Sequence, residues 1–450
     1  MKKIINKKKI QKLAYLLLAG TLICGVPASS ALAVEDEPAP EKSFFSGEYD
    51  AKVEELFKQA MEERDSGDLL SAINDFQTIL NNNPFLHRVR LELAVASYMS
   101  YKPEIAIAEA QKVLADPATP PNVRVSILAF IAQVQQNMKK MGKSRHYWSF
   151  PVSISYLHDS NVNAGPDSYL LGDVTLTPDS GKKSDYGIVT VAGMNHTYRT
   201  TKSVALGNSP ANLLWQSATS VYQRNYFDEK GSDFDVYTLR TGPTLISRGN
   251  WRANISLQED FMRYGGENLA YFTYLLPSWT LHISDSLHTS VDVEISRRDY
   301  TQKIDQGRDS VFLSSRVSLG KTFLADKFSL FGGFQYFNEN ADDKQYSTDG
   351  IDLFINGNWK IIKQSNAYVL YNHTETRYDD PPLPGTAGFD KSRDEISRIW
   401  TFGLNYTFNN FGVLTDWTID GKLRRTKLYS NLDAYEYTRT ETFFTLSHTF

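Results

Sequence analysis

Cysteine is almost absent from this chain of 450 residues, which contains only Cys24. Since Cys24 lies in an amino-terminal segment that we expect to be removed, disulfides and thiolate metal sites are excluded from the mature chain. Long apolar runs are also missing after that segment, and none approaches the roughly 18 apolar residues of a membrane-spanning helix. A helical membrane protein is therefore excluded, whereas a barrel is not, because barrel strands alternate apolar and polar residues.

Catalytic motifs are missing as well. The chain contains no Gly-x-Ser-x-Gly, His-Glu-x-x-His or phosphate-binding loop. Two clusters bring imidazole or acidic groups together, His158 with Asp159 and Asp379 with Asp380, but neither has the spacing of metal ligands. We predict no enzyme, no metal site and no cofactor.

The first 33 residues have the pattern of a secretory signal peptide. Lysines at positions 2, 3, 7, 8, 9 and 12 precede an apolar stretch at 13–26, and Ala31 and Ala33 provide the small residues of a cleavage site. We predict cleavage after Ala33, and bulky Ile23 argues against lipidation of Cys24. The whole chain has 48 basic and 52 acidic residues, so loss of these lysines leaves an acidic protein that is not expected to bind nucleic acid.

A flexible acidic leader at 34–49 is expected to precede a small all-α domain at 50–141. In that domain apolar residues recur at helical spacing, and the pair Ala72 and Ile73 recurs 34 residues later as Ala106 and Ile107. This period indicates tetratricopeptide repeats, with turns at 67–68 and 102–103 and a last helix at 122–138. A plain helical bundle without a peptide groove is the alternative.

The repeat register predicts an inner face that is partly apolar and partly basic. It lacks the lysine and asparagine that clamp a terminal carboxylate in some such domains, so a folded or extended segment is the expected ligand. The candidate partner-binding residues are Phe57, Met61, Arg64, Arg88, Leu91, Val95 and Tyr98. These residues could equally pack between the repeats.

After a basic linker at 138–146, the period becomes two for the rest of the chain, which predicts strands only. In the clearest case, Leu287, Val291 and Ile295 alternate with charged Asp292 and Glu294. The predicted strands are 147–157, 184–199, 211–226, 233–247, 250–263, 269–283, 287–299, 309–323, 327–338, 349–363, 365–378, 393–408, 412–427 and 433–450. An even number of long strands favours a transmembrane antiparallel β-barrel of about 14 strands, at 142–450, over a soluble sandwich.

The connections between these strands are predicted to differ at the two rims. Tight turns are expected at 247–250, 284–286, 324–326, 364 and 409–411, and longer polar loops at 158–183, 300–308, 339–348 and 379–392. This asymmetry is typical of outer-membrane barrels. The connection at 200–210 is an exception, because it is too long for its rim.

The last strand ends the chain on an aromatic residue. Phe444, Leu446 and Phe450 share one face of it, which predicts a signal for barrel assembly. Charged residues on the polar faces of several strands would be costly in lipid, so they are predicted to line the lumen. These lumen-wall residues are Asp292, Glu294, Asp352, Lys360, Asp416, Lys422 and Arg424.

The chain resembles the surface lipoprotein assembly modifiers in the order of its parts and in the segment 148–163, above all in Asp159, Ser160, Asn161, Val162 and Asn163. This resemblance implies a type XI secretion translocator that moves specific lipoproteins or secreted proteins, often ones that capture iron or haem, across the outer membrane. It also implies a periplasmic helical domain that engages cargo, and an assembly machinery and chaperones as partners. An exopolysaccharide export porin and, less favoured, a general porin are the alternatives.

One loop is predicted to affect the resting state of the pore. The 158–183 loop is long and apolar enough to fold back into the lumen, and its apolar residues are Tyr169, Leu170, Leu171, Val174 and Leu176. We therefore expect a barrel that is largely closed at rest.

Overall fold

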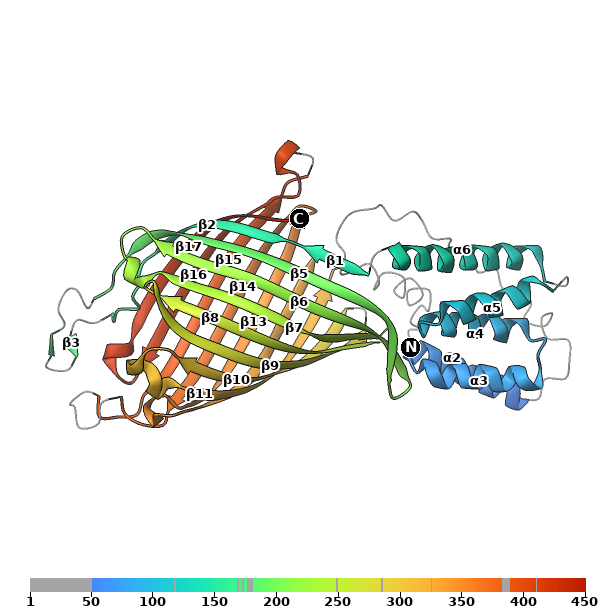
Figure 1. Ribbon diagram of the computed structural model, residues 1–450, viewed down its shortest axis with the longest axis horizontal. Coiled ribbons are helices and arrows are strands. Elements are labelled where there is room, and N and C mark those ends of the chain that lie inside the picture. Colours follow the sequence, from blue (N-terminus) through green and yellow to red (C-terminus); the bar gives the residue numbers. More distant parts are fainter. Residues whose placement is uncertain are drawn as a thin grey trace, which may run out of the picture. The chain divides into compact units, whose positions relative to one another are not determined.

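The computed structural model describes residues 51–116, 119–143, 145–167, 170–171, 174–175, 181–247, 250–284, 286–324, 326–382, 389–409 and 411–450. The predicted signal peptide and acidic leader lie outside these residues. The chain forms two compact units (Figure 1). The first contains the helices together with Thr200–Leu213 and Leu245–Trp251, and the second contains the remaining strands.

The first unit is built from five helices. They are α2 (Ala51–Ser66), α3 (Leu69–Asn82), α4 (His87–Met99), α5 (Pro103–Leu114) and α6 (Pro121–Lys143). Helices α3 and α5 begin at Leu69 and Pro103, which keeps the 34-residue offset of the sequence repeat. Helix α6 is longer than expected and continues to Lys143, so most of the predicted linker at 138–146 is helical.

Local sequence explains where the second helix begins and how it packs. Gly67 takes a φ of 90°, a left-handed conformation that suits glycine, and Asp68 then caps α3 by accepting a hydrogen bond from the Ser71 amide at 3.3 Å. Helix α3 buries apolar residues at helical spacing, namely Leu69, Ala72, Ile73, Phe76, Ile79 and Leu80. Several of these pack against α4 in one core, which includes Val89 and Leu93.

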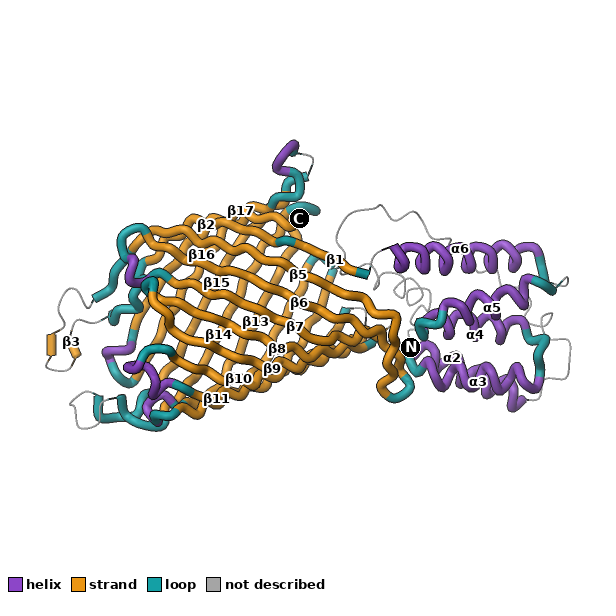
Figure 2. Tube along the Cα trace, viewed as in Figure 1, coloured by secondary structure: helices purple, strands orange, loops and turns teal. Residues whose placement is uncertain are grey.

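The second unit is a closed antiparallel barrel of fourteen strands (Figure 2). The strands are β2 (Pro151–Asp159), β5 (Asp185–Leu206), β6 (Ser209–Tyr226), β7 (Phe234–Ser247), β8 (Trp251–Tyr264), β9 (Glu267–Ser284), β10 (Leu287–Tyr300), β11 (Ser310–Phe323), β12 (Phe328–Ala341), β13 (Thr348–Ile362), β14 (Ser365–Tyr378), β15 (Asp394–Thr407), β16 (Thr418–Ser430) and β17 (Tyr437–Thr449). Each strand pairs with its neighbour in the chain, and β17 pairs with β2 to close the ring. A short strand β1 (His146–Ser149) precedes β2 and shares its partner β5.

Alternation along the strands separates two surfaces of the barrel wall. On β10, Val291 and Ile295 are exposed on the outside, whereas Ser296 is buried on the inside and Glu294 lies 3.7 Å from Arg298. The same division holds on β13, where exposed Leu353 flanks buried Asp352. An apolar outside and a polar inside suit a wall with lipid on one side and water on the other.

Two of the predicted turns were wrong. The connection at 200–210 is not long, because β5 continues to Leu206 and β6 begins at Ser209, with Gly207 at a positive φ of 58° in the turn. The connection at 409–411 is not tight, because β15 ends at Thr407 and β16 begins only at Thr418, with a 3₁₀ turn at Gly412–Leu414 between them. On the other rim, glycines at 265 and 266 make the β8–β9 connection a tight turn.

Candidate functional site

The candidate partner-binding residues lie on two helices. Phe57, Met61 and Arg64 are on α2, and Arg88, Leu91, Val95 and Tyr98 are on α4. Three of the seven pack against the protein's own core. Phe57 and Met61 pack against the first apolar cluster and Leu91 against the second.

The two arginines of this face differ in availability. Arg64 is 7% exposed and forms ion pairs with Asp65, at 2.7 Å, and with Glu92 of α4. This residue was predicted as a contact for a partner, but its charge joins α2 to α4 instead. Arg88 is exposed, and its guanidinium lies over the Phe57 ring at 5.4 Å. Arg88 is therefore the cation of this face that a partner can reach.

Glu92 is the acidic partner in the pair that joins α2 to α4. Burial raises the pKa of the Glu92 carboxyl, and the nearby Arg64 and Arg88 charges oppose that rise. The pair is therefore a buried structural contact, and removing Arg64 would leave a carboxyl without its cation.

The predicted lumen-wall residues fall into two groups. Asp292, Glu294 and Asp352 lie on strand faces that also carry buried residues, and Lys422 and Arg424 are partly buried on the face of β16 opposite its exposed Leu423 and Arg425. Lys360 lies near the last residues of β13 and is exposed. Asp416 was misplaced, because β16 begins two residues later and Asp416 occupies the preceding turn with a φ of 66°.

The closing seam joins the first and last strands. Strand β2 pairs with β17 from Pro151 opposite Thr449 to Asp159 opposite Glu441. Beyond this ladder, Phe150 and Phe450 exchange backbone hydrogen bonds of 2.9 and 3.2 Å, so pairing continues to the last residue. The predicted assembly signal lies along this seam, with the Phe444 and Phe450 side chains exposed on the outside.

A charged network lies inside the barrel where the seam ends. Asp159 is 0% exposed and accepts hydrogen bonds from the Arg439 guanidinium, at 3.0 Å from Nε, and from the Tyr226 hydroxyl at 2.7 Å. Glu441 is 1% exposed and accepts a hydrogen bond from Arg424 at 2.5 Å. These five residues come from β2, β6, β16 and β17.

Arg224 of β6 completes this network. Its Nη1 lies 3.3 Å from Glu441 and 4.0 Å from Asp159. Three arginines thus surround two buried carboxylates, and the network keeps one excess positive charge. We call these six residues, Asp159, Arg224, Tyr226, Arg424, Arg439 and Glu441, the seam network. Because ions are costly to bury unless they are paired, each member depends on the others.

The first loop folds back onto this network. Asn161 is buried, and its amide donates to the Gly165 carbonyl at 2.8 Å and to the Thr438 carbonyl at 3.2 Å. Its side-chain oxygen accepts a bond from the Gly165 amide at 2.8 Å. Val162 then enters an apolar cluster inside the barrel with Leu157. The other members of this cluster are Val189, Tyr226 and Phe443.

Asp167 fastens the same loop to the last two strands. It accepts hydrogen bonds from the Thr438 amide and hydroxyl, at 2.8 and 2.7 Å, and pairs with Lys427 at 2.8 Å and with Lys182. Burial would raise the pKa of the Asp167 carboxyl, but the hydrogen bonds from Lys182, Lys427 and Thr438 outweigh it and hold that pKa well below its usual range. The loop between 160 and 167 is therefore tied to β17 over its whole length.

The structure places only part of the predicted occluding loop. Leu170, Leu171 and Val174 lie in two short paired strands, β3 (Leu170–Leu171) and β4 (Val174–Thr175). Tyr169 and Leu176 lie outside the described residues. Occlusion by this part of the loop stays a prediction.

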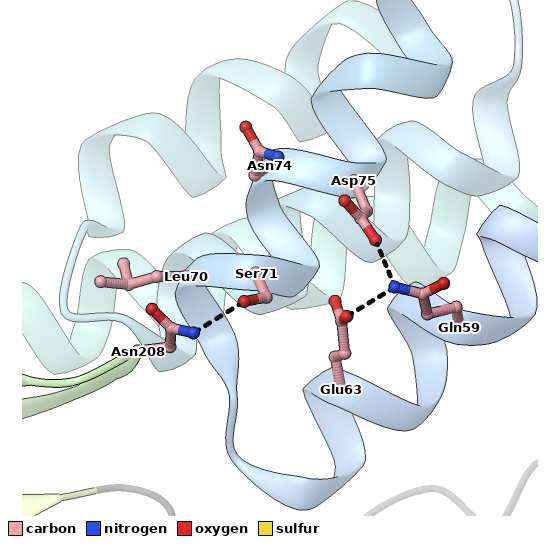
Figure 3. A pocket seen from close by; sticks show the side chains of 7 residues that line it. All are labelled: Gln59, Glu63, Leu70, Ser71, Asn74, Asp75 and Asn208. Atoms are coloured by element: carbon pink, nitrogen blue, oxygen red, sulfur yellow. Dashed lines mark hydrogen bonds between the residues drawn. The ribbon is translucent and has the colours of Figure 1, made fainter.

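A second set of contacts, which sequence reasoning missed, lies in the helical unit. The Asn208 carbonyl accepts a hydrogen bond from the Leu70 amide at 3.1 Å, and its side-chain amide donates to Ser71 at 2.9 Å (Figure 3). The Tyr101 hydroxyl donates to the Ile246 carbonyl at 2.8 Å. Two segments from strand ends therefore complete the packing of this unit.

A cavity of about 420 Å³ adjoins Asn208 (Figure 3). Its lining residues are Gln59, Glu63, Leu70, Ser71, Asn74, Asp75 and Asn208. The Gln59 amide donates to both carboxylates, Glu63 at 2.9 Å and Asp75 at 3.3 Å, so these acids have partners within the protein. Over the described part of the chain there is no group of three or more histidine, cysteine or acidic residues that could hold a metal ion.

These features define the class of protein. None of the described helices is long and apolar enough to cross a membrane. The closed antiparallel wall, apolar outside and charged inside, is that of a transmembrane β-barrel of the outer-membrane type. The model of one family, described as surface lipoprotein assembly modifier, matches residues 148–450. The chain belongs to this family.

Comparisons with solved structures find matches at low identity and low TM-score. OccAB4 of Acinetobacter baumannii is 11% identical, with 68% of this chain and 99% of that chain covered and a TM-score of 0.33. OprD of Pseudomonas aeruginosa is 10% identical, with 68% and 95% covered and a TM-score of 0.35. A bacterial polysaccharide outer membrane secretin is 10% identical, with 66% and 98% covered and a TM-score of 0.36. Likenesses at this level carry no functional inference, and among curated proteins none matches the chain.

Proposed function

We propose that this protein is an outer-membrane translocator that delivers specific surface lipoproteins or secreted proteins to the cell surface, with iron- or haem-capturing proteins as the expected cargo. The observation that carries the proposal is the family match, which spans the barrel from its first strand to the last residue.

We infer the barrel's orientation from its strand number and its short turns. Fourteen strands return the chain to the rim from which it started, so both ends of the barrel lie at one rim, and we place that rim and the helical domain in the periplasm because outer-membrane barrels have their short turns there. The loops at 158–183 and 379–392 then face outside. The seam network and the first residues of the loop lie inside the barrel beside the seam, and we propose that the barrel is shut until cargo arrives.

The helical domain is proposed to engage cargo in the periplasm, as tetratricopeptide-like repeats do with peptide segments. Arg88 is its most accessible candidate contact, because it is exposed and lies over the Phe57 ring. The contact between Arg88 and cargo can be tested with Arg88→Glu in the full chain. The matched control is Lys58→Glu, which changes an exposed lysine of α2 outside the predicted face. Loss of cargo binding by the first variant alone supports the assignment.

Assembly of the barrel is proposed to depend on its last residue. Phe450 presents an exposed ring at the seam, and its backbone pairs with Phe150. A barrel assembly machinery and periplasmic chaperones are the expected partners for this end of the chain. Normal barrel levels after deletion of Phe450 would contradict this role.

A polysaccharide exporter is the second candidate function. It would need a lumen biased toward one charge, with aromatic stacking for sugars, whereas the described interior mixes Asp292, Glu294 and Asp352 with Lys422 and Arg424. The mixed sign suits a protein cargo better.

The deciding experiment is to find which surface protein depends on this barrel. Cells with and without the gene are compared by labelling of exposed proteins, and the affected protein is then co-expressed with the barrel in a host that lacks both. The proposal requires that this protein becomes accessible outside only when the barrel is present. Accessibility without the barrel would overturn it, and steady large conductance of the purified protein without cargo would favour a porin.

A further inference from the structure

The outer surface of the barrel carries a basic patch beside the seam. On β15 and β16, Trp400 pairs with Arg425 and Arg398 pairs with Lys427. Trp400, Arg398 and Arg425 are exposed, so this face points away from the lumen. Arg398 is diagonal to Arg425 across the two strands, which puts their side chains within reach of one shared anion.

The strand that follows makes this surface polar. Thr438, Thr440 and Thr442 of β17 lie opposite Lys427, Arg425 and Leu423, on the same face. The first apolar residue of that face is Phe444, the eighth of β17, which pairs with the glycine at 421. Strand β11, by contrast, presents exposed apolar side chains from its second residue, with Val311 and Leu313.

Acids balance the lysine of this patch but not its two arginines. Lys427 is engaged with Asp167 and Glu436, at 2.8 and 2.6 Å. Arg398 contacts the Tyr429 ring at 5.2 Å, and among the described residues no carboxylate lies within ion-pair distance of Arg398 or Arg425. On the adjoining strand β14, Glu375 lies opposite Ile396 and is 3.2 Å from His373.

Such a surface would be unfavourable against acyl chains. An arginine facing lipid costs up to about 2–4 kcal/mol at the bilayer midplane and little near the interface. Here the two arginines lie between aromatic rings, Trp400 on one side and Tyr429 on the other, where interfacial aromatic residues mark the level of lipid head groups. Guanidinium groups bind phosphate with paired hydrogen bonds. On the same face Thr440 and Thr442 offer hydroxyls to sugar, whereas the Thr438 hydroxyl already donates to Asp167 at 2.7 Å.

We propose that Arg398 and Arg425, with the threonines at 440 and 442, bind the phosphate of a phosphorylated glycolipid of the outer leaflet. The patch lies on the halves of β15, β16 and β17 that adjoin the long loops, so the choice of leaflet rests on the orientation given under the proposed function. Sugar hydroxyls together with phosphate distinguish this ligand from a plain phospholipid. The bound lipid would lie directly against the outside of the seam.

Lipid binding by the purified full chain tests this proposal without any cargo. The probe is bisphosphorylated lipid A, added to the protein in detergent, and bound lipid is measured by native mass spectrometry. The double variant Arg398→Gln with Arg425→Gln should bind lipid A at least about tenfold more weakly, because it loses the charge-assisted hydrogen bonds to phosphate. Conservative Arg398→Lys with Arg425→Lys should keep part of the affinity.

The matched control is Arg297→Gln, which removes an exposed arginine of β10 that already pairs with Asp299 at 2.8 Å. This variant should bind lipid A as the unaltered protein does. Equal binding by the double glutamine variant would overturn the proposal. Equal binding of dephosphorylated lipid A or of phosphatidylglycerol by the unaltered protein would also overturn it. Displacement of lipid A by inorganic phosphate at matching concentration would do the same. Each result would show that the patch does not recognise a phosphorylated glycolipid.

Discussion

Two regions of the barrel wall are held together in different ways. At the seam, β2 has 9 residues, and the carboxylates beside it are 0% and 1% exposed. On the opposite wall, β11 has 14 residues and pairs with β12 along its whole length, from Ser310 to Phe323. Glu339, the carboxylate of that wall that pairs with Arg298 at 3.0 Å, is 18% exposed.

The difference shows where single side chains matter. A long backbone ladder spreads its stability over many hydrogen bonds, each contributing about 0.5–1.5 kcal/mol, so no one residue controls it. The shorter seam depends in addition on buried ions, and removal of one partner from a buried pair costs about 3–5 kcal/mol. The seam is thus the part of the wall that a local event can open, and a lipid-anchored cargo has a physical reason to leave there, since its acyl chains favour lipid over a polar lumen.

The largest expected effect is the loss of export when β2 and β17 are cross-linked by a disulfide. Ser155 and Thr445 face each other across it with hydroxyl oxygens 2.8 Å apart, which places both Cα atoms at a separation suited to a disulfide. Ser155→Cys with Thr445→Cys, oxidised in the envelope, should abolish export and recover on reduction. Surface labelling of cargo measures this.

The matched pair lies on the opposite wall. Ser290 and Ser318 also face each other, with oxygens 2.5 Å apart, so Ser290→Cys with Ser318→Cys adds the same bond far from the seam. Export should continue in this variant after oxidation. If both pairs block export equally, or neither does, the seam has no special part in the passage of cargo.

The second effect concerns stability. Arg439→Ala removes the cation that pairs with buried Asp159, and we expect a loss of about 3–5 kcal/mol in the free energy of unfolding of the barrel. Arg316→Ala is the control on the opposite wall, because Arg316 is exposed and its guanidinium donates a hydrogen bond to the neutral Gln335 at 2.9 Å. Its cost should stay within about 0.5 kcal/mol. Denaturant titration followed by heat-modifiable gel mobility gives both values.

The third effect concerns the first loop. Asn161→Ala removes three hydrogen bonds of a buried side chain, at a cost of about 1–3 kcal/mol, and frees the loop from β17. Conductance of the purified barrel in planar bilayers should therefore rise. Asn163→Ala is the control, because Asn163 bonds Gly181 and Lys183 within the loop and not the seam. An equal rise in both variants would mean that loop folding, and not its attachment to β17, closes the pore.

The smallest effect is a response to pH. The Asp167 pKa is lowered by Lys182, Lys427 and Thr438, so its stabilising contribution is present above the ordinary aspartate pKa of about 3.9 and is lost as pH falls below that value. Conductance should thus be constant between about pH 5 and 8 and rise only in stronger acid. Asp167→Asn should remove this acid response. A transition near neutral pH would point to another group.

The strands were largely predictable because each has a period of two that is set by lipid outside and water inside. Two connections were predicted wrongly. At 200–210 polar residues continue a strand, and at 409–411 polar residues begin a loop, in both cases without a change of period. Helix α6 was predicted too short for a related reason, since the lysines at its end are good helix formers and also resemble a linker.

The site was predicted less well than the fold. Asp159 and Asn161 stood out in the sequence as part of a recognisable segment, but their partners Arg439, Glu441 and Tyr226 did not, since they are separated from them by dozens to hundreds of residues. The charged residues inside the last strand, Arg439 and Glu441, were the available signal. Arg64 was misassigned, because a helical face shows which residues share a side but not which of them meet a second helix.

The contacts of Asn208 have a consequence for the order in which the chain can fold. Helix α3 is complete by residue 82, yet the Leu70 amide and the Ser71 hydroxyl in its first turn bond a residue that emerges from the ribosome and crosses the inner membrane much later. Such distant contacts form slowly, because a long loop must close first. A fragment that ends at residue 145 would therefore contain all the helices but lack the hydrogen bonds between Asn208 and the first turn of α3. These bonds form only after the β5–β6 hairpin has been made.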